Sequence, residues 1–190
     1  MENTDKIAVD IVRASREFIP FAGKLALLPK AAELEQMSLL IGQTPEGEDI
    51  VRRLDEMPHL LVGGTTGSGK TVFLSTLLLS LLVRHQCKEQ LKMLIVSSKP
   101  EDFIAFEQLP HLMSEGILSS GVDAVNYIRH EVFEESERRQ RLFIEERVSK
   151  ISLYNEHMRN KGLPQLPPVV VMVDEFADLV LVIYNKNLFI

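Results

Sequence analysis

The chain has 190 residues, of which 45% are hydrophobic and 25% charged, as in a soluble globular domain with a sizeable core. Its formal net charge of −6 argues against the basic surface typical of nucleic-acid binding, and the single cysteine, Cys87, excludes an internal disulfide. The most apolar run, residues 72–83, is shorter than the roughly 20 residues that span a bilayer. We therefore expect a cytoplasmic protein without a membrane segment.

The N-terminal part of the chain shows no visible chemistry. Residues 1–38 contain helical-looking stretches that Pro20 and Pro29 interrupt, and we treat them as a separate N-terminal helical segment. Residues 38–51 are typical of two short strands joined by a turn at 45–47, where proline, glutamate and glycine follow one another. The pattern predicts a hairpin that leads into a larger domain.

From residue 59 onward, short apolar runs alternate with helical stretches. The runs at 59–62, 93–96 and 169–173 predict three strands, and the last of these is an unbroken run typical of a strand buried on both faces. Helices are expected at 70–85 and over 123–158. Strands separated by helices indicate a parallel α/β sheet.

The predicted helical region at 123–158 carries acidic and basic residues four positions apart. The pairs are Glu134–Arg138, Glu135–Arg139 and Glu137–Arg141. They fit the solvated face of an ordinary surface helix, and a regulatory or DNA-facing charged helix is the alternative.

A glycine-rich loop between the first predicted strand and the first long helix matches the Walker A pattern G-x-x-x-x-G-K-[ST] in full. Glycines let phosphate oxygens approach the main chain, successive amides form an anion site, and the following helix adds its positive end. The lysine is expected to reach the β- and γ-phosphates and the last threonine to coordinate Mg²⁺. The predicted ATP-binding residues are Gly64, Thr65, Thr66, Gly67, Ser68, Gly69, Lys70 and Thr71.

The second half of such a site, the Walker B motif, should follow another buried strand. Asp174 comes directly after the apolar run 169–173, which places its carboxylate at the ligand-binding edge of a parallel sheet. Asp174 is the candidate Mg²⁺ partner and Glu175 the candidate base that orients the attacking water. Alternatively, both residues cap a helix that begins at Phe176. Lys99, after the second predicted strand, is either a third residue at this edge or a solvated lysine.

Beyond the Walker A and Walker B motifs, residues 39–181 as a whole resemble the FtsK/SpoIIIE family of DNA-pumping P-loop ATPases. The resemblance rests on the segment 57–70 around the P-loop, on residues 109–112 (LPHL), on 137–139 (ERR), on Tyr154–Asn155 and on 173–179 (VDEFADL), all in the family's order. It identifies residues 39–190 as an FtsK-like ATPase domain.

The resemblance implies a RecA-like fold, with a parallel sheet flanked by helices, ring-shaped homo-oligomers, and ATP- and Mg²⁺-dependent translocation along double-stranded DNA. The chain departs from the family at Ser97–Ser98, where a more acidic sequence is common, and after Leu181. We count three of about five core strands and expect a domain truncated after Walker B, with no counterpart of the family's arginine finger or DNA-tracking loops. The alternatives are a nucleotide-binding fragment without catalysis and an ATPase of a secretion or conjugation system.

Overall fold

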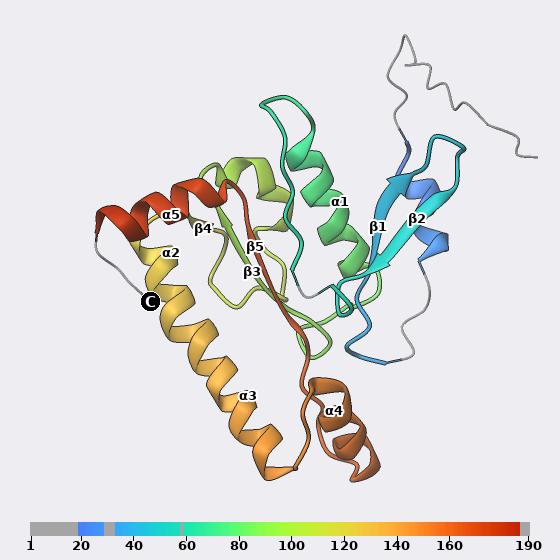
Figure 1. Ribbon diagram of the computed structural model, residues 1–190, viewed down its shortest axis with the longest axis vertical. Coiled ribbons are helices and arrows are strands. Elements are labelled where there is room, and N and C mark those ends of the chain that lie inside the picture. The colour runs from blue at the N-terminus through green and yellow to red at the C-terminus, as the bar shows by residue number, and fades with distance from the viewer. Residues whose placement is uncertain (1–18, 29–32, 58, 187–190) are drawn as a thin grey trace, which may run out of the picture.

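The computed structural model describes residues 19–28, 33–57 and 59–186, shown in Figure 1. The elements in chain order are η1 (Ala22–Leu27), β1 (Ser38–Gln43), β2 (Asp49–Arg53), α1 (Lys70–Leu82), β3 (Lys92–Ser97), η2 (Pro100–Phe106), β4 (Leu118–Ser119), α2 (Val122–Tyr127), η3 (Ile128–Val132), α3 (Phe133–Glu145), α4 (Ile151–Asn160), β5 (Val169–Val173) and α5 (Phe176–Asn185).

The central sheet has three parallel strands in the order β4-β3-β5. This confirms the α/β class, the two strands predicted at 93–96 and 169–173, and the helix that follows the glycine-rich loop. The two-residue strand β4 was not predicted. Its length explains the miss, because two residues are too few to show a periodic pattern.

Strand β3 lies at the centre of the core and is buried on both faces. Met93 and Ile95 pack in one apolar cluster with residues of α1 and η2, whereas Leu94 and Val96 pack in a second cluster with residues of α2 and α5. Figure 1 shows these helices on opposite sides of the sheet. A strand covered on both faces requires apolar side chains at every position, and β3 has them from Met93 to Val96.

Two sequence predictions about strands were wrong. Residues 59–62 form no strand: the segment is irregular, and the side chain of Leu61 is 88% exposed. Strand β5 is not buried on both faces, since Val171 remains 38% exposed. Among the described residues β5 pairs only with β3, so one of its edges is free. An apolar run shows that a segment favours burial, but a strand also needs a pairing partner from elsewhere in the chain.

The predicted hairpin is confirmed as the antiparallel pair β1–β2. Leu39 of β1 enters the core beside α1. The fully buried Ser80 of α1 accepts a hydrogen bond from the Leu40 amide at 3.2 Å and donates to the Thr76 carbonyl at 2.8 Å. The hairpin is thereby attached to the helix that carries the glycine-rich loop. The proposed boundary at residue 38 stays a prediction, and residues 1–18 lie outside the described residues.

The helical region predicted at 123–158 consists of α2, η3 and α3 in succession, followed by α4. Glu135 contacts both Arg138, at 2.6 Å, and Arg139, at 2.8 Å. Within the described part of the chain Arg138 thus pairs with Glu135 rather than with Glu134, while Glu137 and Arg141 are 3.8 Å apart and exposed. Glu135 thus holds two arginines of its own helix at once.

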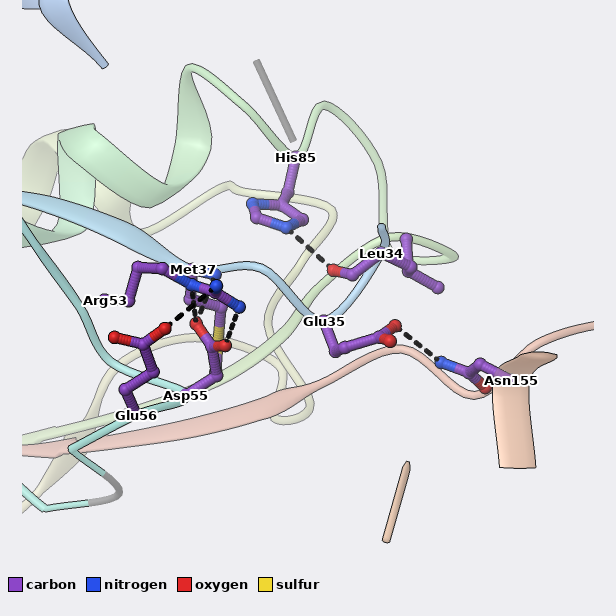
Figure 2. Close-up of polar contacts among 8 residues, drawn as sticks. All are labelled: Leu34, Glu35, Met37, Arg53, Asp55, Glu56, His85 and Asn155. Atoms are coloured by element: carbon purple, nitrogen blue, oxygen red, sulfur yellow. Dashed lines mark hydrogen bonds and ion pairs between the residues drawn. The ribbon is translucent and has the colours of Figure 1, made fainter. Parts of the chain in front are cut away.

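Asn155 of α4 joins three segments beneath the sheet, and Figure 2 shows part of this contact. Its amide nitrogen donates to the Leu166 carbonyl at 3.0 Å and to the carboxylate of the buried Glu35 at 3.2 Å. Its amide oxygen accepts from the Leu166 N–H at 2.8 Å. The neighbouring Leu34 carbonyl faces His85 Nε2 at 3.0 Å. The segment before β1 and the proline-rich connector before β5 are therefore held together by one buried side chain.

None of the helices in the described ranges combines the length and apolar character that crossing a membrane requires.

Asn155→Ala should lower the free energy of unfolding by about 2–4 kcal/mol, because Glu35 and the Leu166 amide would lose their partners in a buried site. Urea denaturation measures the change. Asn160→Ala, an exposed asparagine on the same helix, is the matched control and should change stability by less than about 1 kcal/mol. Equal stability of the two variants would contradict the assigned role of Asn155.

Glu135→Gln should remove an acid-sensitive contribution to stability. The hydrogen bond from Arg138 and the nearby Arg139 hold the pKa of Glu135 at about 2, below its ordinary value of 4.5. A carboxyl group whose pKa is lower in the folded state stabilises the fold above pH 4.5, and this contribution disappears as the pH falls towards 2. We expect a loss of about 0.5–1 kcal/mol at pH 7 and none near pH 2. Thermal unfolding across this pH range, with Glu137→Gln as control, tests the difference.

Candidate nucleotide-binding site

The glycine-rich loop, residues 64–69, connects the irregular segment 59–63 to the first residue of α1. Gly67 and Gly69 have φ angles of 75° and 97°, in the left-handed region that strongly favours glycine. The Ser68 amide donates to the Thr65 carbonyl at 3.1 Å and closes the loop. The predicted need for glycine is confirmed at these two positions.

Gly64 is required for a different reason, which is space. A Cβ atom at this position would lie 2.5 Å from Ser68 Oγ and 3.4 Å from Lys70 Cγ. The first distance is shorter than any real Cβ contact, whereas the second is an ordinary van der Waals contact. Any larger residue would therefore force the Ser68 hydroxyl to move.

Lys70, the first residue of α1, folds its side chain back over the loop. Its ammonium group donates to the carbonyl oxygens of Gly64 at 2.8 Å and Thr65 at 3.2 Å. A positive charge is thus held at the helix N-terminus, where the helix dipole also favours anions. Phosphate oxygens are stronger acceptors for an ammonium group than these carbonyls, so an entering phosphate could replace them.

The remaining loop residues are accessible to solvent. Thr65, Thr66 and Ser68 are exposed, and Thr71 is half-buried in the first turn of α1. The predicted residues 64–71 therefore form one continuous surface around the start of the helix. An open cavity of about 590 Å³ lies elsewhere, lined by Leu34, Lys88, Lys92 and Pro164 among others, and does not include the loop.

Asp174 is held at the carboxyl edge of the sheet, as predicted. Its backbone N–H donates to the Val96 carbonyl at 2.8 Å, and its Oδ2 accepts a hydrogen bond from Ser97 Oγ at 3.0 Å. Sequence reasoning missed Ser97 as a site residue. The signal was present, because Ser97 follows the buried run 93–96 just as Asp174 follows 169–173, and the carboxyl ends of neighbouring parallel strands meet at one edge.

Glu175 adopts an uncommon backbone conformation, with φ 56° and ψ 65°, at the junction of β5 and α5. Such a conformation costs a non-glycine residue about 1–3 kcal/mol and is frequent at functional sites. Glu175 occupies the N-cap position of α5 but makes no side-chain capping bond. The Asp174 carboxylate is bonded to Ser97, so neither acidic side chain serves mainly as a helix cap.

The two halves of the site lie toward the same end of the sheet. Figure 1 shows the loop before α1 and the carboxyl end of β5 both in the upper part of the molecule. The structure shows no hydrogen bond between residues 64–71 and Asp174 or Glu175 within the described ranges. Lys99 is exposed beyond the end of β3. Its backbone amide, rather than its ammonium group, contacts the carboxyl edge of the sheet by donating a hydrogen bond to Ser97 Oγ at 3.0 Å.

The donor set fits a magnesium nucleotide. Exposed amides and an ammonium group at a helix N-terminus match the charge of a polyphosphate, and the hydroxyl of Thr71 with the carboxylate of Asp174 supplies oxygen ligands of the kind that Mg²⁺ prefers. One bond from Ser97 leaves further lone pairs on the Asp174 carboxylate for such an ion or its water.

Curated relatives of this chain include proteins named as DNA translocases. It is 37% identical over 145 residues to "DNA translocase FtsK" of Campylobacter jejuni subsp. jejuni (strain 81-176), a match that covers 76% of this chain and 15% of that protein. It is 34% identical over 183 residues to "DNA translocase FtsK" of Clostridium tetani, covering 95% of this chain and 24% of that protein. The chain thus spans less than a quarter of the length of these relatives.

Solved structures with a similar fold include the secretion-system proteins EccC and EssC. The cytoplasmic domain of the Thermomonospora curvata type VII secretion ATPase EccC matches with a TM-score of 0.65 and 24% identity, over 86% of this chain and 21% of that one. EssC (ATPases 2 and 3) from Geobacillus thermodenitrificans matches with a TM-score of 0.60 and 26% identity, over 77% of this chain and 28% of that one.

These likenesses agree with the arrangement of the loop, the buried strands and the acidic edge. They support an ATPase domain of the P-loop class. The model of the FtsK/SpoIIIE family matches residues 25–188, most of the chain, and the chain belongs to the FtsK/SpoIIIE family.

Proposed function

We propose that this chain is the ATP-binding part of a motor domain that couples ATP hydrolysis to translocation along double-stranded DNA. The observation that carries the proposal is Lys70, whose ammonium group lies over a glycine loop at the start of α1. The similarity to proteins named DNA translocase FtsK supports double-stranded DNA as the substrate. A ring-shaped homo-oligomer in the cytoplasm is the assembly that the family resemblance suggests.

In this proposal, different residues bind the phosphates, hold Mg²⁺ and promote hydrolysis. The loop amides of residues 64–69 and Lys70 hold the phosphates, while Thr71 and Asp174 hold Mg²⁺, which neutralises phosphate charge when bound. Glu175 is the base that orients the attacking water. Its exposed side chain, free of a capping bond, is available for that role.

Two other functions remain alternatives. An ATPase with a polypeptide substrate is favoured by the similarity to the secretion ATPases EccC and EssC. Nucleotide binding without turnover is the other alternative, and the measurements below distinguish it from the first two.

Lys70→Ala should abolish ATP hydrolysis and weaken ATP binding by about 10–100-fold, because a charge-assisted hydrogen bond contributes about 1.5–3 kcal/mol. Hydrolysis is measured with Mg²⁺, with and without linear double-stranded DNA, and binding by titration calorimetry. Lys88→Ala, an exposed lysine beyond α1, is the matched control and should behave as wild type.

The same measurements separate the three functions. DNA-stimulated hydrolysis supports the motor. Hydrolysis that DNA leaves unchanged, together with retention of a secreted polypeptide, would favour the secretion ATPase. Binding without hydrolysis would favour the nucleotide-binding fragment, and equal ATP affinity of wild type and Lys70→Ala would contradict the site itself.

Glu175→Gln should lower the hydrolysis rate by about 10²–10⁴-fold and leave ATP affinity unchanged, since the amide cannot accept the proton of the attacking water. Single-turnover hydrolysis and equilibrium binding measure the two effects. Glu156→Gln, the same change at an exposed position on α4, provides the control. A Glu175→Gln variant that hydrolyses ATP at the wild-type rate would remove Glu175 from the mechanism.

A further inference from the structure

Ser97 is a polar residue at the end of an otherwise apolar buried strand. It is the last residue of β3, follows four fully buried hydrophobic side chains, and is itself 0% exposed. Apolar packing does not explain a hydroxyl at this position, and burying a hydroxyl costs folding free energy unless it is hydrogen-bonded. Ser97 Oγ makes two hydrogen bonds, to Asp174 and to the Lys99 amide, and these explain why a serine is tolerated at this buried position.

The chemistry of its neighbours fixes the direction of both bonds. The Lys99 backbone amide can only donate, and it donates to Ser97 Oγ at 3.0 Å. The Asp174 carboxylate, when ionised, can only accept, and its Oδ2 lies 3.0 Å from the same Oγ. The single hydroxyl hydrogen of Ser97 is thus directed to Asp174.

Asp174 is held to β3 by its main chain and by its side chain. Val173 pairs with Val96 in the parallel register, and the Asp174 amide donates to the Val96 carbonyl at 2.8 Å. The bond from Ser97 adds a second attachment at the carboxylate. With both ends held, the carboxylate has little freedom to rotate.

The hydroxyl of Ser97 that donates to Asp174 is uncharged, and this matters if the Asp174 carboxylate binds a metal ion. A lysine or arginine in the place of Ser97 would neutralise the charge that attracts a divalent cation, whereas a hydroxyl orients the carboxylate and leaves its negative charge in place. Partners of this kind behind metal-binding side chains typically contribute about 10–100-fold to metal affinity.

We propose that Ser97 is a positioning residue for Mg²⁺: it orients the Asp174 carboxylate through a neutral hydrogen bond and acts on the ion only through Asp174. The inference rests on the proposed function, because it assigns the magnesium partner to Asp174. It gives a physical role to a position at which this chain departs from the more acidic sequence of the family.

Ser97→Ala should raise the Mg²⁺ concentration for half-maximal tightening of nucleotide binding by about tenfold. The readout is the affinity for a fluorescent ATP analogue, measured in EDTA and over a series of Mg²⁺ concentrations. Affinity in EDTA should equal that of wild type, because the loop and Lys70 are untouched. Ser98→Ala, the exposed neighbouring serine, is the matched control and should leave both values unchanged.

A double-mutant cycle with Asp174→Asn shows whether Ser97 acts through Asp174. In that background, Ser97→Ala should have no further effect on Mg²⁺ dependence. Ser97→Cys, which has almost the same size but a weak donor, covers the case of an alanine variant that does not fold and should shift Mg²⁺ dependence in the same direction.

The outcomes distinguish the two proposals. Wild-type protein that shows no Mg²⁺-dependent nucleotide binding would overturn the proposed function and this inference with it. Wild-type protein that does show it, together with folded Ser97→Ala and Ser97→Cys variants of unchanged Mg²⁺ dependence, would overturn the role of Ser97 alone. An effect of Ser97→Ala that persists in the Asp174→Asn background would also overturn it.

Discussion

Strand β3 is the element on which the rest of this structure depends. Its side chains from Met93 to Val96 are fully buried and pack alternately against the layer of α1 and the layer of α2 and α5. Parallel pairing with β4 on one side and β5 on the other brings the carboxyl ends of the three strands to one edge. The acidic site exists because this buried strand fixes where its neighbours end.

The two charged side chains of the candidate site, Lys70 and Asp174, have uncharged hydrogen-bond partners. Lys70 uses weak carbonyl acceptors of its own loop, so its charge is held in place but poorly neutralised. Asp174 uses a neutral hydroxyl, so its charge is oriented and retained. Glu175 has a left-handed backbone conformation, and its side chain makes no capping hydrogen bond. Opposite charges are thus preserved at one end of the sheet without pairing with each other.

The contacts at the opposite end of the sheet have a different character. Asn155 uses its amide nitrogen and oxygen on Glu35 and Leu166, which lie 120 and 11 positions away in the sequence. They attach the segment before β1 and the connector before β5 to α4, and the hairpin is attached in turn to α1 through Ser80. The side-chain amide of Asn155 is hydrogen-bonded within the chain, whereas the side chains of Thr66, Ser68 and Glu175 are exposed to solvent.

The sequence by itself determined the glycine loop, the helix after it, the strands at 93–96 and 169–173, the hairpin and the position of Asp174, because each follows from local pattern and backbone sterics. It could not determine pairing. The run at 59–62 has the apolar character of a strand but pairs with no strand among the described residues, and Val171 is exposed although its run is unbroken. The contact of Ser97 with Asp174 joins residues 77 positions apart. Only the tertiary structure decided these features, since hydrogen bonds between strands depend on which distant segments the fold brings together.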